Sequence, residues 1–228
     1  MSIITLSSIS KIYSEKTARK TVALQNINLE VNEGEFLAIS GPSGSGKTTL
    51  LNMIGGLDSP SNGRIILNNK DITTLKENAL SHIRLHQIGF IFQAYNLIPV
   101  LTALENMEYI LMLQRIKKEE RQARVKDVAF RLGIDDLLDK RPSEMSGGQQ
   151  QRVAIARAIV SKPKLILADE PTANLDSKTG EILLDLMKEL NEEHAMTFIF
   201  ATHDSSVIKK AKRHVSLLDG MVKDDQAK

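Results

Sequence analysis

The clearest chemical signal in the chain is the glycine-rich run Gly41-Pro42-Ser43-Gly44-Ser45-Gly46-Lys47-Thr48, which continues into Thr49. Glycines carry no Cβ, so several backbone N–H groups can converge on phosphate oxygens, and a helix beginning at Lys47 would add its positive N-terminal end. The Lys47 ammonium can reach β- and γ-phosphates, and the Thr48 hydroxyl can ligate magnesium. A flexible loop without a ligand is the alternative. Because the run lies between an apolar strand and a helix, we expect it to bind ATP and Mg²⁺.

Two carboxylates complete this expected chemistry. The apolar segment 164–169 delivers Asp169 at its end, and Glu170 follows directly. We expect Asp169 to hold Mg²⁺ opposite Thr48, and Glu170 to orient the water that attacks the γ-phosphate. In the alternative interpretation the pair lies on a surface turn, where Pro171 simply ends the strand.

The elements that must position these residues alternate along the chain. Segments 4–13 and 22–31 alternate apolar and polar residues, as half-buried antiparallel strands do. Segment 35–40 is more uniformly apolar, which is typical of a buried central strand. Strand and helix patterns then alternate, which predicts an α/β fold: a P-loop NTPase core with a mostly parallel sheet and an N-terminal antiparallel β subdomain. Further strands are expected at 63–67, 88–92, 164–169 and 197–202, and helices up to about 160 and at about 177–193.

The middle of the chain is helical. From Thr102 to about Leu132 apolar residues recur at spacings of three and four, Thr102 and Glu105 form a capping box, and Gly133 ends the second helix. We therefore expect a single domain, 1–228. Residues 1–92 and 161–228 would form the nucleotide-binding core with the β subdomain, and about 93–160 the helical insertion.

Composition limits the other classes of function. The 228 residues include no cysteine, which excludes disulfides and cysteine-based zinc sites. No apolar run approaches the roughly 18 residues that a membrane-spanning helix needs. The net charge is +2 with mixed signs, and there is no Trp, three Tyr and six Phe, so we expect no nucleic-acid partner.

A second motif gives the sequence a family resemblance. The run Met145-Ser146-Gly147-Gly148-Gln149-Gln150-Gln151-Arg152 resembles the signature of the ABC ATPases, with Met145 in place of the usual Leu. These two side chains are close in volume and exchange at low cost. The resemblance covers essentially the whole chain. Its motifs follow in the family's order: Tyr13, the glycine-rich run, Gln93, the signature, Asp169-Glu170, Asn174-Leu175-Asp176 and His203.

The resemblance implies roles for residues that composition and spacing leave open. It places Tyr13 under the adenine, although Tyr13 could equally be a surface aromatic at a strand end. It makes Gln93 a ligand of Mg²⁺ that also contacts the attacking water, and His203 a partner of the γ-phosphate, although a lone histidine is more often structural. The signature would face the γ-phosphate held by a second subunit, and its alternative is a simple helix cap; its residues in this role are Ser146, Gly147, Gly148 and Gln149.

Partners follow from the same resemblance. The wider wording, including segments 92–97 and 168–176, is similar to the subgroup serving lipoprotein release, macrolide export, antimicrobial-peptide resistance and cell division. It implies a homodimer with composite ATP sites that powers a separate integral membrane permease and contacts the membrane only through it, on the cytoplasmic face of the inner (plasma) membrane. The cargo would be a lipid-like, lipoprotein, peptide or drug molecule that is exported or extracted.

Three alternatives stay open at this point. A soluble ABC-type ATPase could act on ribosomes or DNA, although this chain has neither tandem cassettes nor a long coiled-coil insertion. A cell-division or regulatory switch with little transport would carry the same catalytic residues. The apolar segment 94–101 would receive a short permease helix according to the resemblance, but by itself it could fold back into the core.

Overall fold

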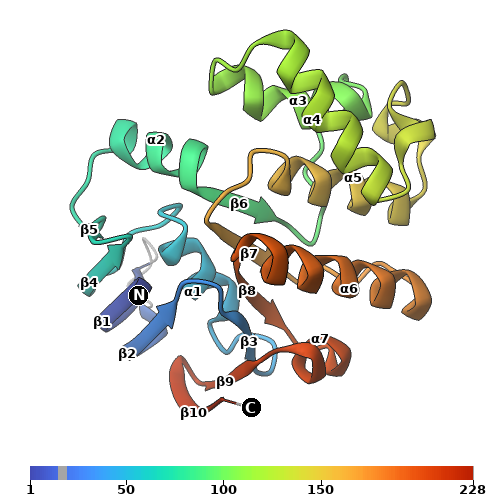
Figure 1. Cartoon of the computed structure of the whole chain (residues 1–228). Coiled ribbons are helices and arrows are strands. Elements are labelled where there is room, and N and C mark those ends of the chain that lie inside the picture. The colour runs from blue at the N-terminus through green and yellow to red at the C-terminus, as the bar shows by residue number, and fades with distance from the viewer. Residues whose placement is uncertain (15–19, 228) are drawn as a thin grey trace.

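The computed structural model describes residues 1–14 and 20–227 of the chain. Two sheets and a helical lobe make up the molecule (Figure 1). One sheet has four strands in the order β2-β1-β4-β5, and the other has six in the order β10-β9-β3-β8-β7-β6. The α/β fold with an antiparallel N-terminal sheet, a mostly parallel second sheet and a helical insertion is confirmed.

The antiparallel sheet is built by the alternating N-terminal segments. Alternate residues of β1, such as Ile4 and Leu6, are buried, and Leu6 pairs with Leu29 of β2. The pattern of period two therefore gives the sheet one apolar face. The strands are β1 (Ser2–Ser14), β2 (Lys20–Asn32), β4 (Asn62–Leu67) and β5 (Lys70–Asp71).

The second sheet brings three strand ends to one edge. Strands β6, β7, β8, β3 and β9 run parallel, and β10 pairs antiparallel with β9. The segments that follow β3, β7 and β8 therefore meet at the carboxyl edge of the sheet, where ligands bind in open α/β sheets. The strands are β3 (Phe36–Ser40), β6 (Ile88–Ile91), β7 (Leu165–Asp169), β8 (Thr197–Thr202), β9 (Arg213–Leu218) and β10 (Met221–Ala227).

Two apolar cores lie on opposite faces of the parallel sheet. Leu37 and Ile39 of β3 face the core that contains α1 and the antiparallel sheet, whereas Phe36 and Ala38 face the core shared with α5 and α6. The sheet is thus buried on both faces, as its continuous apolar strands require. The helices packed around it are α1 (Lys47–Ile54), α2 (Glu77–Gln87), α5 (Gly147–Ile159), α6 (Ser177–His194) and α7 (Ser205–Lys210).

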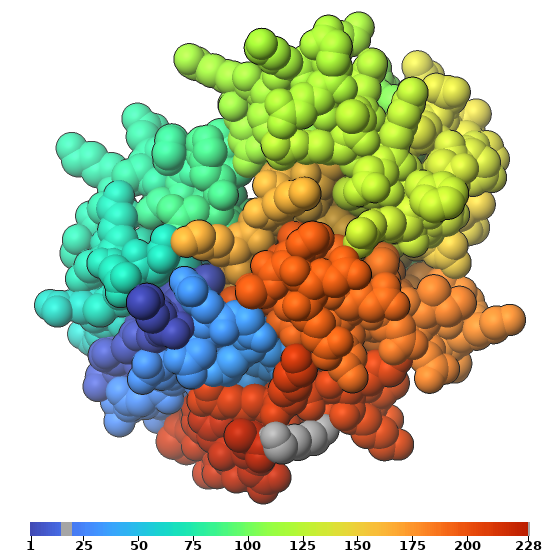
Figure 2. Space-filling view, in the orientation of Figure 1, coloured from blue at the N-terminus to red at the C-terminus, as the bar shows by residue number. Residues whose placement is uncertain are grey.

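The helical lobe projects from the sheets and is formed by α3 (Ala103–Leu113) and α4 (Lys118–Arg131) with α5 beneath them. In the space-filling view it lies at the opposite side of the molecule from the C-terminal strands (Figure 2). The predicted capping box of Thr102 and Glu105 is present, and Gly133 adopts φ +60° just after α4. Of the described helices, none is both long and apolar enough to cross a membrane.

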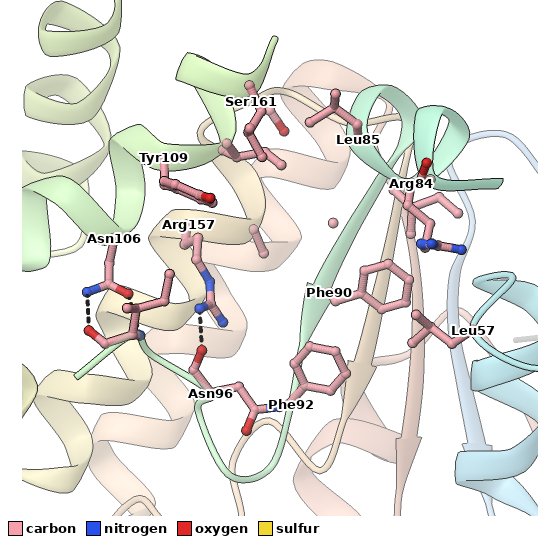
Figure 3. A pocket seen from close by; sticks show the side chains of 17 residues that line it. Leu57, Arg84, Leu85, Phe90, Phe92, Asn96, Asn106, Tyr109, Arg157 and Ser161 are labelled. Carbon is pink, nitrogen blue, oxygen red and sulfur yellow. Dashed lines mark hydrogen bonds between the residues drawn. The ribbon is translucent and has the colours of Figure 1, made fainter. Parts of the chain in front are cut away.

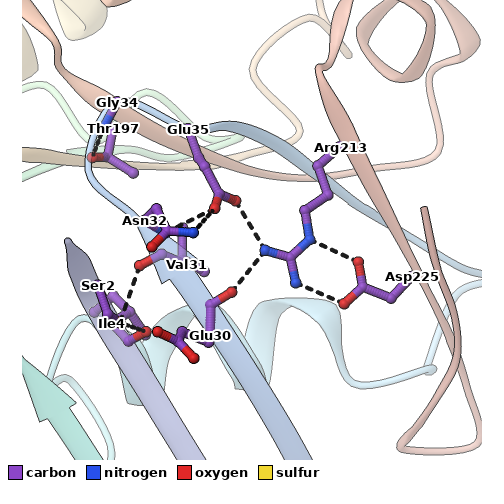
Figure 4. A network of polar contacts seen from close by, with 10 residues as sticks. All are labelled: Ser2, Ile4, Glu30, Val31, Asn32, Gly34, Glu35, Thr197, Arg213 and Asp225. Carbon is purple, nitrogen blue, oxygen red and sulfur yellow. Dashed lines mark hydrogen bonds and ion pairs between the residues drawn. The ribbon is translucent and has the colours of Figure 1, made fainter. Parts of the chain in front are cut away.

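One arginine joins the two sheets (Figure 4). Arg213 of β9 forms two parallel hydrogen bonds of 2.7 Å with the Asp225 carboxylate of β10. Its Nη1 also donates to the Glu30 carbonyl of β2 at 2.7 Å and to Glu35 Oε2 at 3.0 Å. The Asp225 hydrogen bonds are the main reason why the pKa of Arg213 is raised, and those same bonds lower the pKa of Asp225.

Candidate active site

The glycine-rich loop connects the end of β3 to α1 in a conformation that needs glycine. Gly44 and Gly46 adopt φ values of +79° and +101°, and a Cβ on Gly46 would come within 2.6 Å of the Ala23 carbonyl oxygen. Helix α1 begins at Lys47, and no side chain caps its N-terminus. The first-turn N–H groups therefore stay open to an anion.

The lysine of this loop is held by the loop itself, whereas the hydroxyl of a buried serine is unpaired within the described part of the chain. Lys47 Nζ donates to the Gly41 carbonyl at 2.7 Å and to the Pro42 carbonyl at 3.1 Å, so the ammonium lies over the loop. Ser45 is buried, and its Oγ has no hydrogen-bond partner among the residues that the structure describes.

The oxygen atoms expected around Mg²⁺ are adjacent. Thr48 Oγ1 donates a hydrogen bond of 2.9 Å to Asp169 Oδ2 at the end of β7. Burial raises the pKa of Asp169, and the neighbouring Glu170 charge adds to this, while the Thr48 hydrogen bond and Lys47 act in the opposite direction. The site therefore favours a positive charge beside Asp169.

The Glu170 carboxylate is fixed from two sides. Oε1 lies 2.6 Å from His203 Nδ1, and Oε2 accepts a hydrogen bond of 3.1 Å from Thr202 Oγ1. The backbone of Glu170 has φ +47°, and its N–H donates to the Ala201 carbonyl at 2.9 Å. A non-glycine residue in this region costs about 1–3 kcal/mol and persists only where its surroundings fix it.

These groups line one cavity of about 350 Å³. Gln93 lies on the wall of this cavity, and its backbone carbonyl accepts a hydrogen bond of 2.9 Å from Asn174 Nδ2. The structure thus brings together predicted residues from the loop and from three strand ends. The predicted site residues that line the cavity are Ser43, Gly44, Gly46, Lys47, Thr48, Thr49, Gln93, Asp169, Glu170 and His203.

Tyr13 lies outside the lining of this cavity, at the end of β1. Its hydroxyl donates to Asp58 Oδ2 at 2.7 Å, and Lys11 Nζ lies 4.8 Å from the ring centroid. Burial, followed by the Asp58 hydrogen bond, raises the pKa of Tyr13, and a hydrogen bond with Thr49 lowers it. The ring is therefore next to a residue that does line the cavity, and it is 42% exposed.

Three signature residues, Ser146, Gly148 and Gln149, line a different cavity, of about 320 Å³, which shares no lining residue with the first. Ser146 caps α5: its Oγ accepts from the Gln149 N–H at 3.3 Å, and the Gln149 side chain accepts from the Ser146 N–H at 2.8 Å. Gly147 leaves room for Tyr95, whose hydroxyl would lie 2.9 Å from a Cβ at that position. The N-terminal turn of α5 thus lies at a different cavity from the chain's own phosphate loop.

An apolar groove of about 400 Å³ lies between α2, β6 and α3 (Figure 3). Arg157 of α5 lies in it and donates to the Asn96 and Tyr95 carbonyls at 2.5 and 2.8 Å. Ile98 lines the groove and is 36% exposed. Of the two interpretations of segment 94–101, folding back into the core applies to Leu97, which is partly buried and packs against the larger core.

Several residues of the site were not predicted from the sequence. Thr202 donates a hydrogen bond to the Glu170 carboxylate, Gln151 donates to the Pro171 carbonyl, and Arg157 donates to the Tyr95 carbonyl. Segment 21–23 of β2 lines the phosphate cavity. Thr202 could have been inferred from its position before His203, but the others depend on contacts between distant elements, which no spacing reveals.

A loop of this kind at the carboxyl end of a central strand, with a carboxylate pair on a strand of the same sheet, defines the class of P-loop nucleoside triphosphatases. Within that class, residues 24–173 match the model of the family described as ABC transporter. The chain belongs to this family and is an ATP-binding cassette that hydrolyses ATP.

Similar proteins cover nearly the whole chain. YvrO of Bacillus subtilis, an uncharacterized ABC transporter ATP-binding protein, is 49% identical over 96% of this chain and 94% of its own length. LolD 1 of Rhodopseudomonas palustris, the ATP-binding protein of a lipoprotein-releasing system, is 41% identical over 96% of this chain and 98% of its own. A dimeric, post-hydrolysis structure of the cassette MJ0796 of Methanocaldococcus jannaschii, bound to ADP and Pi, has a TM-score of 0.93 at 43% identity and covers 98% of each chain.

Proposed function

We propose that this chain powers a membrane permease encoded as a separate chain, and that it does so as a homodimer with two shared ATP sites. The observation that carries the dimer is the separation of the phosphate cavity from the signature cavity. The Ser146 cap occupies only the Gln149 N–H of α5, and a helix N-terminus attracts an anion through its remaining first-turn N–H groups, yet the chain's own phosphate loop lines another cavity. In a two-fold pair each signature would close the other subunit's ATP site. The MJ0796 structure, which is dimeric and bound to ADP and Pi, supports the formation of a dimer.

Within each site we assign the binding of ATP to the phosphate loop and to Tyr13. The loop N–H groups, the α1 N-terminus and Lys47 would hold the triphosphate, and Tyr13 would stack on the adenine. Gly41, Pro42 and Ser45 lie outside the cavity lining and would support the loop: the Gly41 and Pro42 carbonyls accept hydrogen bonds from Lys47, and Ser45 is buried. The signature residues of the second subunit would complete the site.

The donor set beside this loop fits Mg²⁺. Thr48 and Asp169 offer adjacent hard oxygen ligands, and the Gln93 amide lies on the same wall. Mg²⁺ is commonly bound by one or two such groups together with phosphate oxygens. When bound, the ion would neutralise charge on the β- and γ-phosphates. Glu170 would orient the attacking water, and His203, fixed by Glu170, would hold the γ-phosphate.

The permease would dock in the groove beside segment 94–101. The groove is lined mainly by apolar side chains, and Ile98 is partly exposed in it. An exposed apolar patch of this kind suits a short apolar helix. We also infer that about 93–160 act as a helical subdomain that carries both the groove loop and the signature. The chain would then be peripheral, on the cytoplasmic face of the inner membrane.

The cargo class rests on similarity alone. The resemblance to LolD 1, the ATP-binding protein of a lipoprotein-releasing system, favours extraction or export of a lipid-like or lipoprotein molecule. Peptides and drugs belong to the same proposed range.

A mixing experiment tests the shared sites. Lys47→Ala and Ser146→Arg should each abolish ATPase activity in a homodimer, because each change damages both sites. In mixed dimers both lesions fall in one site and the other stays intact, so a heterodimer should keep about one half of the parental rate. A 1:1 mixture, in which about half of the dimers are heterodimers, should therefore show about one quarter of that rate. Absence of any recovery, with heterodimers demonstrated by differently tagged subunits, would show that each signature serves its own chain's nucleotide.

A further inference from the structure

Gln151 is a buried amide of the signature helix whose side chain reaches the catalytic loop. It is 2% exposed, and its Nε2 donates a hydrogen bond of 2.7 Å to the Pro171 carbonyl. Pro171 directly follows Glu170 and has no N–H, so its carbonyl is the one backbone polar group through which this position can be held. Helix α5 is therefore tied to the peptide unit next to the Glu170 carboxylate.

Stability does not explain why an amide stands there. Gln151 Oε1 is buried without a hydrogen-bond partner among residues 1–14 and 20–227. A buried polar atom of this kind costs about 1–3 kcal/mol, which offsets what the Nε2 hydrogen bond to the Pro171 carbonyl contributes to stability. The hydrogen bond to the Pro171 carbonyl is therefore the contact that gives an amide a role at this position.

That hydrogen bond holds Pro171, the residue directly after the strained Glu170. Glu170 has φ +47°, a conformation that the surroundings must impose. On one side the carboxylate is fixed by Thr202 and His203. On the other side the loop is fixed at Thr172, whose Oγ1 donates to Asp204 Oδ2 at 2.7 Å, and at Pro171, by Gln151.

We infer that Gln151 is a positioning residue for hydrolysis: it holds Glu170 of its own chain in the orientation that water activation requires. The inference rests on the proposed catalytic role of Glu170. It also has a consequence for the dimer. The N-terminal turn of α5 would face the partner's ATP, while Gln151, one turn further along, holds the chain's own Glu170 loop. A shift of α5 on binding the partner's nucleotide would thus reach the chain's own catalytic carboxylate.

The test is Gln151→Met, which keeps the side-chain volume and removes the donor. We expect kcat for ATP to fall about 10- to 100-fold, because a small misplacement of a catalytic group has effects of this size. The KM for ATP and the affinity for a fluorescent ATP analogue should stay within about threefold of the parent. The thermal midpoint should change little, because the lost hydrogen bond to the Pro171 carbonyl is offset by removal of the unpaired Oε1. Parental kcat in the folded variant would overturn the inference.

A matched control is Asn191→Leu. Asn191 is equally buried, and its Nδ2 donates to the Gly34 and Met196 carbonyls at 2.8 and 2.6 Å, away from the nucleotide cavity. Its loss should lower the thermal midpoint and leave kcat unchanged at temperatures below the transition. If Gln151→Met and Asn191→Leu gave the same pattern, Gln151 would be a structural residue only.

Two further measurements distinguish a failure of the inference about Gln151 from a failure of the proposed role of Glu170. Should Gln151→Met fail to fold, Gln151→Leu takes its place, and failure of both variants would overturn the inference because the amide would then be needed for folding. Glu170→Gln is measured beside them. If it hydrolyses ATP at the parental rate, the proposed role of Glu170 has failed; if it is inactive while folded Gln151→Met is fully active, only the inference about Gln151 has failed.

Discussion

At the scale of single residues, the two neighbouring carboxylates have different surroundings and can therefore have different roles. Asp169 is paired with the Thr48 hydroxyl, and burial raises its pKa, so a bound cation would be the natural compensation. Glu170 is held by Thr202 and by His203 Nδ1. With Nδ1 occupied in this way, His203 Nε2 is left to face the cavity that the ring lines.

Glu170→Gln is the residue-scale prediction. The amide keeps the shape of the side chain and loses the charge that orients water, so we expect kcat to fall at least about 100-fold while ATP affinity stays nearly unchanged. With hydrolysis blocked, the ATP-bound dimer should accumulate and appear as a larger species in size-exclusion chromatography with ATP. Lys47→Ala serves as the control, since it should lose nucleotide affinity and stay monomeric. Turnover at the parental rate would mean that Glu170 is not the catalytic carboxylate.

At the scale of elements, sequence patterns predicted the parts whose side chains are sorted by burial. The alternation of β1 and β2, the apolar β3 and β7, and the capped α3 and α5 were all anticipated. Helix α2 was missed because only Ile83 of its residues is buried and its N-cap, Lys76, makes no side-chain capping bond. Strand β10 was missed because its residues are mostly exposed; its one local signal is the turn Asp219-Gly220, where both residues have positive φ.

The residues of the candidate site fall into two similar groups: those that a local sequence motif identifies and those that only packing brings into place. The phosphate loop and the pair Asp169-Glu170 are local in sequence, so their motifs were sufficient to predict them. The side chains that orient them come from elsewhere: Gln151 lies 20 residues from Pro171, and Thr202 lies 32 residues from Glu170. Which side chain of a helix meets a given carbonyl is decided by packing, and periodicity identifies only the buried face.

The groove loop gives the element-scale prediction. Ile98 lines the groove, so Ile98→Glu should weaken copurification with a co-expressed permease by about tenfold or more, because a buried unpaired charge at an interface is costly. The isolated subunit should keep its thermal midpoint within about 2 °C and its ATP affinity. Leu97→Glu is the contrasting variant: Leu97 packs against the core, and its change should lower stability by about 2 kcal/mol or more.

Two outcomes would contradict this assignment. A large fall in the thermal midpoint of Ile98→Glu would show that the side chain belongs to the core. Equal loss of copurification in Val100→Glu, whose side chain is 71% exposed and lies outside the groove lining, would show that any added charge in the loop has the same effect.

At the scale of the whole molecule, the two sheets depend on a small number of polar contacts between them as well as on the shared core. Arg213 reaches the Glu30 carbonyl on β2, Glu35 before β3 and Asp225 on β10, so it joins three segments that are far apart in the sequence. The guanidinium suits this position because its planar donors can bind a carboxylate with two parallel hydrogen bonds and still reach other acceptors. The C-terminal hairpin is thereby tied to the sheet that carries the phosphate loop.

Asp225→Asn tests this connection through its pH dependence. The hydrogen bonds from Arg213 lower the pKa of Asp225 below its usual range, so the folded state favours the ionised form. The resulting stabilisation is complete above the unfolded pKa of about 3.9 and is lost as the pH falls through the folded pKa.

Because the pair is partly exposed, we expect Asp225→Asn to lower the free energy of unfolding by up to about 1 kcal/mol, or the thermal midpoint by about 2–4 °C, at neutral pH. The difference from the parent should begin to shrink below about pH 4, where Asp225 of the unfolded chain takes up a proton, and should vanish only below the lowered folded pKa, where Asp225 of the folded parent is neutral as well. Asp224→Asn, on the same strand and without an ion pair among the described side chains, is the control and should change the midpoint by no more than about 1 °C. Thermal melts of the three proteins between neutral and acidic pH decide the matter, and a difference that persists unchanged into acid would show that Asp225 acts through packing and not through its charge.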